Sequence, residues 1–186
     1  MNYDVPFNHN VWLSSDVRGG EGELFDGLRK KLFGPKKSDL HKEIESLVSQ
    51  VDFTDPQARI GWKISETIGV QLSLLDLETE QVSATGEFAT PNFRGAILGT
   101  ALGLAEVEGA TEDHDLLLDT ILYSFIYVYG DKNGRLLASA TVEQYKAGDD
   151  KVVSASNWAE EDLVLVLTKP SGASISGIYV AGMGMI

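Results

Sequence analysis

The stretch that decides the predicted fold runs Ile121-Leu-Tyr-Ser-Phe-Ile-Tyr-Val-Tyr129, then Gly130-Asp-Lys-Asn-Gly134, then Arg135-Leu-Leu-Ala-Ser-Ala-Thr-Val-Glu-Gln-Tyr145. Its first part is rich in β-branched and aromatic residues, which favour the half-buried surface of a strand. The Asn-Gly pair supplies residues that tolerate the positive φ of a tight turn. We therefore predict a long β-hairpin, whose arms Ile121–Tyr129 and Arg135–Tyr145 are joined at Asp131–Gly134.

Composition bounds the class of protein. The chain has 186 residues, of which 43% are hydrophobic, and it contains no cysteine. This length suits one domain with a core of its own, and the absence of cysteine excludes disulfides and thiolate metal sites. The formal net charge of −13 disfavours nucleic acid and anionic membranes as partners. The excess acid either keeps the protein in solution or serves a dedicated basic protein partner.

No targeting or membrane segment is recognisable in the sequence. Residues 1–10 have neither the basic start nor the apolar run of a secretory signal. No apolar run reaches the roughly 18 residues that a membrane helix needs. We therefore expect a cytoplasmic or virion location and no membrane partner.

The N-terminal region, residues 1–55, is predicted to be an irregular arm followed by two helices. Gly34-Pro35 ends the first helix, and Ser38 caps the second. Because the connection is short, the helices should pack as a hairpin. The hydrophobic residues at helical spacing are Leu24, Phe25, Leu28, Leu32 and Phe33 in the first helix, and Leu40, Ile44, Leu47, Val48 and Val51 in the second.

The hydrophobic period changes to two from about Ala58 onward. Apolar residues alternate with small or polar ones over residues 60–64 and again over 68–74. Alternation is typical of half-buried strands. The rival interpretation is a helix that opens at Thr54-Asp55-Pro56, with a cap followed by proline at the first helical position. We favour strands here.

The segment Phe93 to Val107 fits two structures. Gly95, Gly99 and Gly103 are spaced four apart, which is the small-residue pattern of closely packed helices. In water, three glycines would cost a helix about 3 kcal/mol relative to alanine. We therefore favour a strand whose glycine face packs closely against another backbone.

The C-terminal part completes the predicted sheet structure. Short apolar runs at Val152-Val153, Leu163–Leu167 and Ser174–Ala181 are separated by turn residues. Together with the earlier runs they predict about eight or nine strands at regular spacing. The fold class is thus mainly β (α+β): an antiparallel β-sandwich or jelly-roll-like body over residues 56–186, with an N-terminal arm and helical hairpin.

The last seventy or so residues support this through a resemblance. A long strand pair around Asp131–Gly134 is followed by Asn157-Trp158, Pro170-Ser-Gly172, Ser176 and Ile178-Tyr-Val180. This arrangement resembles the immunoglobulin- and fibronectin-III-like modules of uncharacterised bacterial and phage-associated proteins. The resemblance implies a sandwich architecture and leaves the function open.

The chain offers few groups for chemistry. Asp113-His114-Asp115, near Glu112 and Asp119, is the densest set of possible metal ligands, and its alternative is a solvated acidic loop. Asp131–Gly134 lacks the later oxygen ligands of a calcium loop. The sequence has neither a nucleophile elbow nor a Walker loop. We therefore predict no catalytic residues, no metal and no cofactor, and expect that the protein is not an enzyme.

A basic cluster stands out in this acidic chain. It holds 5 of the 15 basic residues, with no acid between positions 29 and 37. It either complements a helix C-terminus or docks on the acidic surface of a neighbouring copy. We predict an interaction surface there, with apolar area added by the arm. The predicted interaction residues are Trp12, Arg29, Lys30, Lys31, Lys36 and Lys37.

These features together predict a non-catalytic structural or interaction protein. We expect a subunit of a larger assembly, such as a phage particle or a bacterial surface structure. The alternative is an acidic immunity or inhibitor protein that binds a basic partner such as a toxin. In both cases the partners are other protein chains or further copies of this one, with no nucleic acid and no small-molecule substrate.

Overall fold

The computed structural model describes residues 54–168 and 176–185. Its helices are α3 (Pro56–Leu74), the 3-10 helix η1 (Glu87–Ala89), α4 (Pro91–Val107), α5 (His114–Lys146), α6 (Asp150–Thr168) and α7 (Gly177–Gly182). The part of the chain described here contains no strand, so the predicted mainly β (α+β) class is wrong, as is the β-sandwich or jelly-roll-like body. The sandwich architecture implied by the immunoglobulin- and fibronectin-III-like resemblance is wrong for the same reason.

The chain divides into two units, Met1–Asp52 and Phe53–Ile186. The described helices all belong to the second unit. The predicted N-terminal arm and helical hairpin fall on residues 1–55, of which only the last two lie in the described part. Both therefore remain predictions.

Helix α3 starts where the rival interpretation placed a helix. The Asp55 carboxylate accepts a hydrogen bond from the Gln57 amide at 3.0 Å, and Pro56 occupies the first turn. Its buried face repeats every fourth residue, which is helical spacing. The strands predicted from about Ala58 onward are therefore wrong. The buried apolar residues of this face are Ile60, Ile64, Ile68 and Leu72.

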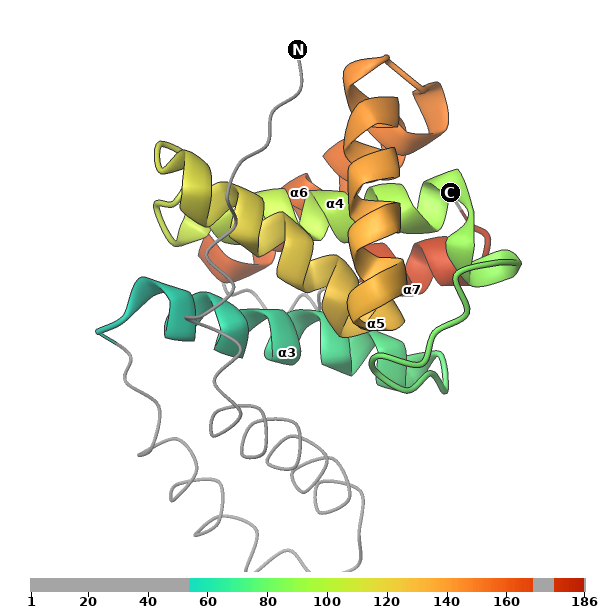
Figure 1. Cartoon of the computed structure of the whole chain (residues 1–186), viewed down its shortest axis with the longest axis horizontal. Coiled ribbons are helices and arrows are strands. Elements are labelled where there is room, and N and C mark those ends of the chain that lie inside the picture. Colours follow the sequence, from blue (N-terminus) through green and yellow to red (C-terminus); the bar gives the residue numbers. More distant parts are fainter. Residues whose placement is uncertain (1–53, 169–175, 186) are drawn as a thin grey trace, which may run out of the picture. The chain divides into compact units, whose positions relative to one another are not determined.

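Helix α4 is the centre of the body and contacts α3, α5, α6 and α7 (Figure 1). Thr90 caps it, and its hydroxyl accepts from the Phe93 amide at 3.3 Å. Most of its residues are buried on every side, which is typical of a core helix. The strand predicted for Phe93 to Val107 is wrong. The close packing expected of its glycines does occur, against the backbone of α6.

Helix α5 replaces the predicted β-hairpin. Ile121, Phe125 and Val128 lie at helical spacing and are buried. Gly130, with φ 74° and ψ 167°, breaks the helix into two arms that run in clearly different directions (Figure 1). Gly134 does not form a hairpin turn; it lets the second arm approach the backbone of Ile126.

The loop between α3 and α4 is hydrogen-bonded to the first arm of α5, just before the break at Gly130. The amide of Glu80 donates to the Tyr127 carbonyl at 2.8 Å, and the amide of Val82 donates to the Val128 carbonyl at 3.2 Å. These carbonyls would otherwise lack partners, because the helix stops at Gly130. The loop thus supplies hydrogen-bond donors to the last backbone carbonyls of the first arm of α5.

The last predicted strands are also helical. Val152-Val153 and Leu163–Leu167 both lie in α6, which begins where the Asp149 carboxylate accepts from the Lys151 and Val152 amides. The described end of Ser174–Ala181 forms most of α7. The buried face of α6 consists of Val152, Ala155, Ser156, Ala159 and Leu163.

Candidate protein-interaction surface

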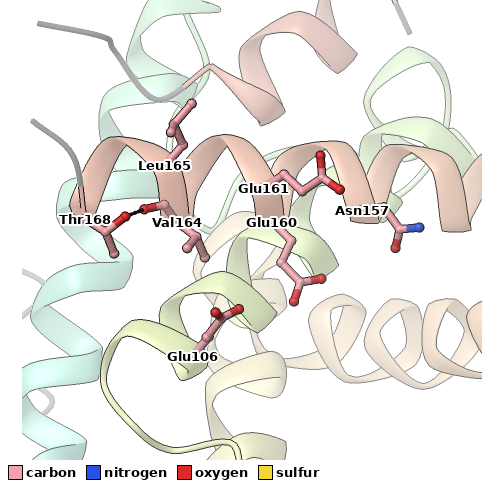
Figure 2. A pocket seen from close by; sticks show the side chains of 7 residues that line it. All are labelled: Glu106, Asn157, Glu160, Glu161, Val164, Leu165 and Thr168. Atoms are coloured by element: carbon pink, nitrogen blue, oxygen red, sulfur yellow. Dashed lines mark hydrogen bonds between the residues drawn. The ribbon is translucent and has the colours of Figure 1, made fainter. Parts of the chain in front are cut away.

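A hollow of about 490 Å³ lies between α6 and the C-terminal end of α4 (Figure 2). Six of its seven lining residues belong to α6, on the side of that helix opposite its buried face. The seven are Glu106, Asn157, Glu160, Glu161, Val164, Leu165 and Thr168.

The close packing of α4 on α6 sets the position of this hollow. A Cβ placed on Gly95 would lie 2.6 Å from the Val152 carbonyl oxygen, and one on Gly99 would overlap the carbonyl of Ser156. Only glycine allows two helix backbones to approach this closely. The short separation brings the end of α4, with Glu106, beside Glu160 on α6.

The hollow is strongly acidic. Glu106 and Glu160 point toward the same space between the two helices, and Glu161 lies one residue further along α6 (Figure 2). No basic residue lines the hollow, and the ion pairs found in the described part of the chain involve none of these three carboxylates. Burial raises the pKa of Glu160, and the neighbouring charges of Glu106 and then Glu161 raise it further. The site therefore attracts a positive charge.

One exposed large apolar side chain, Leu165, lines the hollow with these carboxylates, and a second, Trp158, lies outside the hollow near Gly177 of α7. Leu165 is 51% exposed, and Trp158 is 38% exposed. They are seven residues apart, two turns of the helix, so they share one edge of α6. We call these two residues, together with the seven that line the hollow, the acidic face. It combines fixed negative charge with exposed apolar area, which suits a segment carrying both lysine or arginine and apolar side chains.

No protein-family model, curated protein or solved structure matches this chain significantly. In the described part of the chain, no helix is both long enough and apolar enough to cross a membrane.

The interaction residues predicted from the sequence lie outside the described residues. These are Trp12, Arg29, Lys30, Lys31, Lys36 and Lys37. The structure instead adds the acidic face, which the sequence interpretation missed. Its signal was present: Asn157, Glu161, Val164 and Thr168 recur three or four residues apart, as on one side of a helix. The sequence analysis instead predicts turn residues followed by a strand in this region, which separates these positions.

The acidic segment around His114 has a structural role. Asp113 caps α5, and its carboxylate accepts from the amides of Asp115 and Leu116, each at 3.1 Å. Burial raises the pKa of Asp119, and the charges of Asp115 and then Asp113 add to this effect. Across residues 54–168 and 176–185, no three histidine, aspartate or glutamate side chains come together in a way that could hold a metal ion.

The aromatic residues of Ile121–Tyr129 lie on different sides of α5. Phe125 and Tyr129 stack in the core with ring centroids 6.3 Å apart, whereas Tyr123 and Tyr127 are half-buried. The Tyr129 hydroxyl donates to the Phe88 carbonyl at 2.6 Å. These residues hold the core and the loop before α4, so they provide no common binding surface.

Proposed function

We propose that this chain is a non-catalytic interaction protein whose acidic face binds a basic surface of another protein. One observation carries the proposal. Glu106, Glu160 and Glu161 have no ion-pair partner in the described part of the chain, and they share their hollow with the exposed Leu165, which lies two helical turns from the exposed Trp158 on α6. Like charges held together raise the free energy of the unbound state, and a cationic partner relieves this repulsion.

The overall charge supports the same conclusion. Residues 54–168 and 176–185 contain 19 acidic and 7 basic residues. Such an excess attracts a basic protein at long range and speeds its encounter. Exposed ion pairs contribute only about 0–1 kcal/mol each. The apolar contacts of Trp158 and Leu165 would therefore supply most of the affinity.

The packing beneath the acidic face favours recognition without rearrangement. Ser156, Ala159 and Leu163 are buried against neighbouring helices while the opposite side of α6 stays exposed. A surface that is already ordered loses little conformational entropy on binding. The face thus presents its charges in a fixed pattern.

Two biological settings suit such a protein. The first is a subunit of a larger assembly, such as a phage particle or bacterial surface structure. The second is an immunity or inhibitor protein that neutralises a basic partner such as a toxin. Solution mass separates them, because an assembly subunit should self-associate whereas an inhibitor should remain a monomer or dimer.

The test is direct binding of a basic amphipathic peptide to the full chain. We expect a fluorescently labelled peptide of alternating lysine and leucine pairs to bind saturably by anisotropy, and binding to weaken as salt rises. The triple variant E106K/E160K/E161K should weaken binding by about tenfold or more. The matched control is E66K, which reverses an exposed charge on α3. Equal loss in both variants would contradict a localised site.

A further inference from the structure

We infer that the acidic face is occupied by the basic segment 29–37 of a second copy of this chain. This inference rests on the proposed function and names its partner. The receiving surface is an exposed face of α6 that no described helix covers: Leu165 and Trp158 remain 51% and 38% exposed. The segment complements this surface in charge and carries apolar residues of its own.

The segment matches the acidic face in both chemical features. It reads Arg29-Lys-Lys-Leu-Phe-Gly-Pro-Lys-Lys37, with five basic residues and no acid. Its charges suit Glu106, Glu160 and Glu161, and its central Leu32-Phe33 pair suits the apolar edge of Leu165 and Trp158. No other run of nine residues in the chain combines five bases with no acid.

This pairing has a consequence for assembly. The donor segment and the acceptor face are different surfaces of the same chain, so the contact between two copies is heterologous. A dimer joined by one such contact still has one free donor, on one copy, and one free acceptor, on the other. Association continues until a ring closes or an open chain of subunits forms.

The experiment measures the mass of the full chain by sedimentation at several protein concentrations. At about 0.05 M salt we expect the mean mass to rise with concentration beyond that of a dimer, and at about 0.5 M salt to fall toward the monomer, because salt screens exposed charges. Two variants are compared with the parent chain. The donor variant is K30E/K31E/K36E/K37E, and the acceptor variant is E106K/E160K/E161K.

Each variant alone should remain monomeric at low salt. An equimolar mixture should associate again, because the basic segment of the acceptor variant meets the acidic face of the donor variant, and the two reversed surfaces carry opposite charges as well. A chain carrying both sets of reversals should associate again through exchanged charges. Circular dichroism checks that every variant keeps the helical content of the parent.

The outcomes separate this inference from the proposed function. If the parent chain stays monomeric while the lysine–leucine peptide binds the acidic face, the inference is overturned and the proposed function stands. If the parent chain associates but the mixed variants do not, the pairing of segment and face is overturned. If neither copies nor peptide bind, both proposals fail.

Discussion

The backbone of Gly99 lies directly against the carbonyl of Ser156, so closely that a methyl group on Gly99 would overlap that oxygen. This contact joins the central helix α4 to α6. It also determines how near Glu106 comes to Glu160, since both residues lie further along the same helix pair. The acidic face is thus a consequence of glycine packing in the core.

Gly99→Ala should therefore destabilise the fold. The obstructing atom belongs to the α6 backbone and cannot rotate away, so the helices must separate. We expect a loss of about 3 kcal/mol or more in the free energy of unfolding, at the upper end of overpacking effects. Chemical denaturation of the full chain measures it.

The matched control for this change is Gly103→Ala, one turn further along α4. There an added Cβ would lie 3.1 Å from a Leu163 methyl and 3.2 Å from the Glu160 carbonyl, so the neighbours need shift only slightly. Alanine also gains about 1 kcal/mol of helix propensity over glycine. We expect a change within about 1 kcal/mol. Equal losses at both positions would show that the close contact at Gly99 has no special role.

Gly130→Ala should destabilise the fold, because it strains the bend between the two arms of α5. Gly130 has φ 74° and ψ 167°, a region that residues with a Cβ avoid, and the added Cβ would lie 3.0 Å from the Glu80 carbonyl oxygen. We expect a loss of about 1–3 kcal/mol in thermal or chemical unfolding. Gly148→Asn is the control, because Gly148 has φ 77°, an added Cβ there would meet none of the other described residues within 4 Å, and asparagine tolerates positive φ. A larger loss at Gly148 than at Gly130 would contradict this account.

Gln71→Leu should weaken the packing of α7 on α3, because it removes the hydrogen bonds between them. The Gln71 side chain is fully buried, and its oxygen accepts from the amides of Ile178 at 2.7 Å and Tyr179 at 3.3 Å. Leucine leaves both amides without this acceptor, at a cost of about 1–3 kcal/mol. Hydrogen exchange at the Ile178 amide should accelerate. The control is Gln144→Leu, because the buried Gln144 oxygen has no hydrogen-bond partner among the described residues, so its removal should be neutral or stabilising.

Glu160→Gln should change how stability depends on pH. The pKa of Glu160 is raised in the folded chain, so between the unfolded pKa of about 4.3 and the raised value the folded state binds more protons. The free energy of unfolding contributed by this group therefore falls as pH rises through that interval. Glutamine cannot titrate, so the variant should gain stability relative to the parent as pH increases. Denaturation from about pH 4 to about pH 8 tests this, with Glu66→Gln as control.

The sequence contained the signal for α3 but also a competing one. Asp55-Pro56 is a cap followed by proline, and both act as expected of a helix start. The alternation over residues 60–74 outweighed it in the prediction. Isoleucines at 60, 64 and 68 satisfy a period of two and also a spacing of four. Periodicity alone could not distinguish a strand from a helix here, whereas the helix-capping sequence Asp55-Pro56 could.

Tertiary packing explains the remaining errors. Glycines at 95, 99 and 103 lower helix propensity by about 3 kcal/mol in total, yet α4 forms because it is buried on all sides by other helices. The β-branched and aromatic residues of Ile121–Tyr129 similarly pack as a helix. Once α6 is known to be a helix, the spacing of its glutamates follows from the sequence. The position of Glu106 does not, because it depends on the packing of α4 against α6.

The most direct test of the central claim uses Trp158 as a reporter on the acidic face. Replacing Trp12 and Trp62 by phenylalanine leaves Trp158 as the single tryptophan of the full chain. Titration with the lysine–leucine peptide should shift Trp158 emission saturably, and E160K/E161K should abolish that shift at the same peptide concentration. Peptide binding detected by anisotropy with Trp158 emission unchanged would place the contact elsewhere and contradict the account.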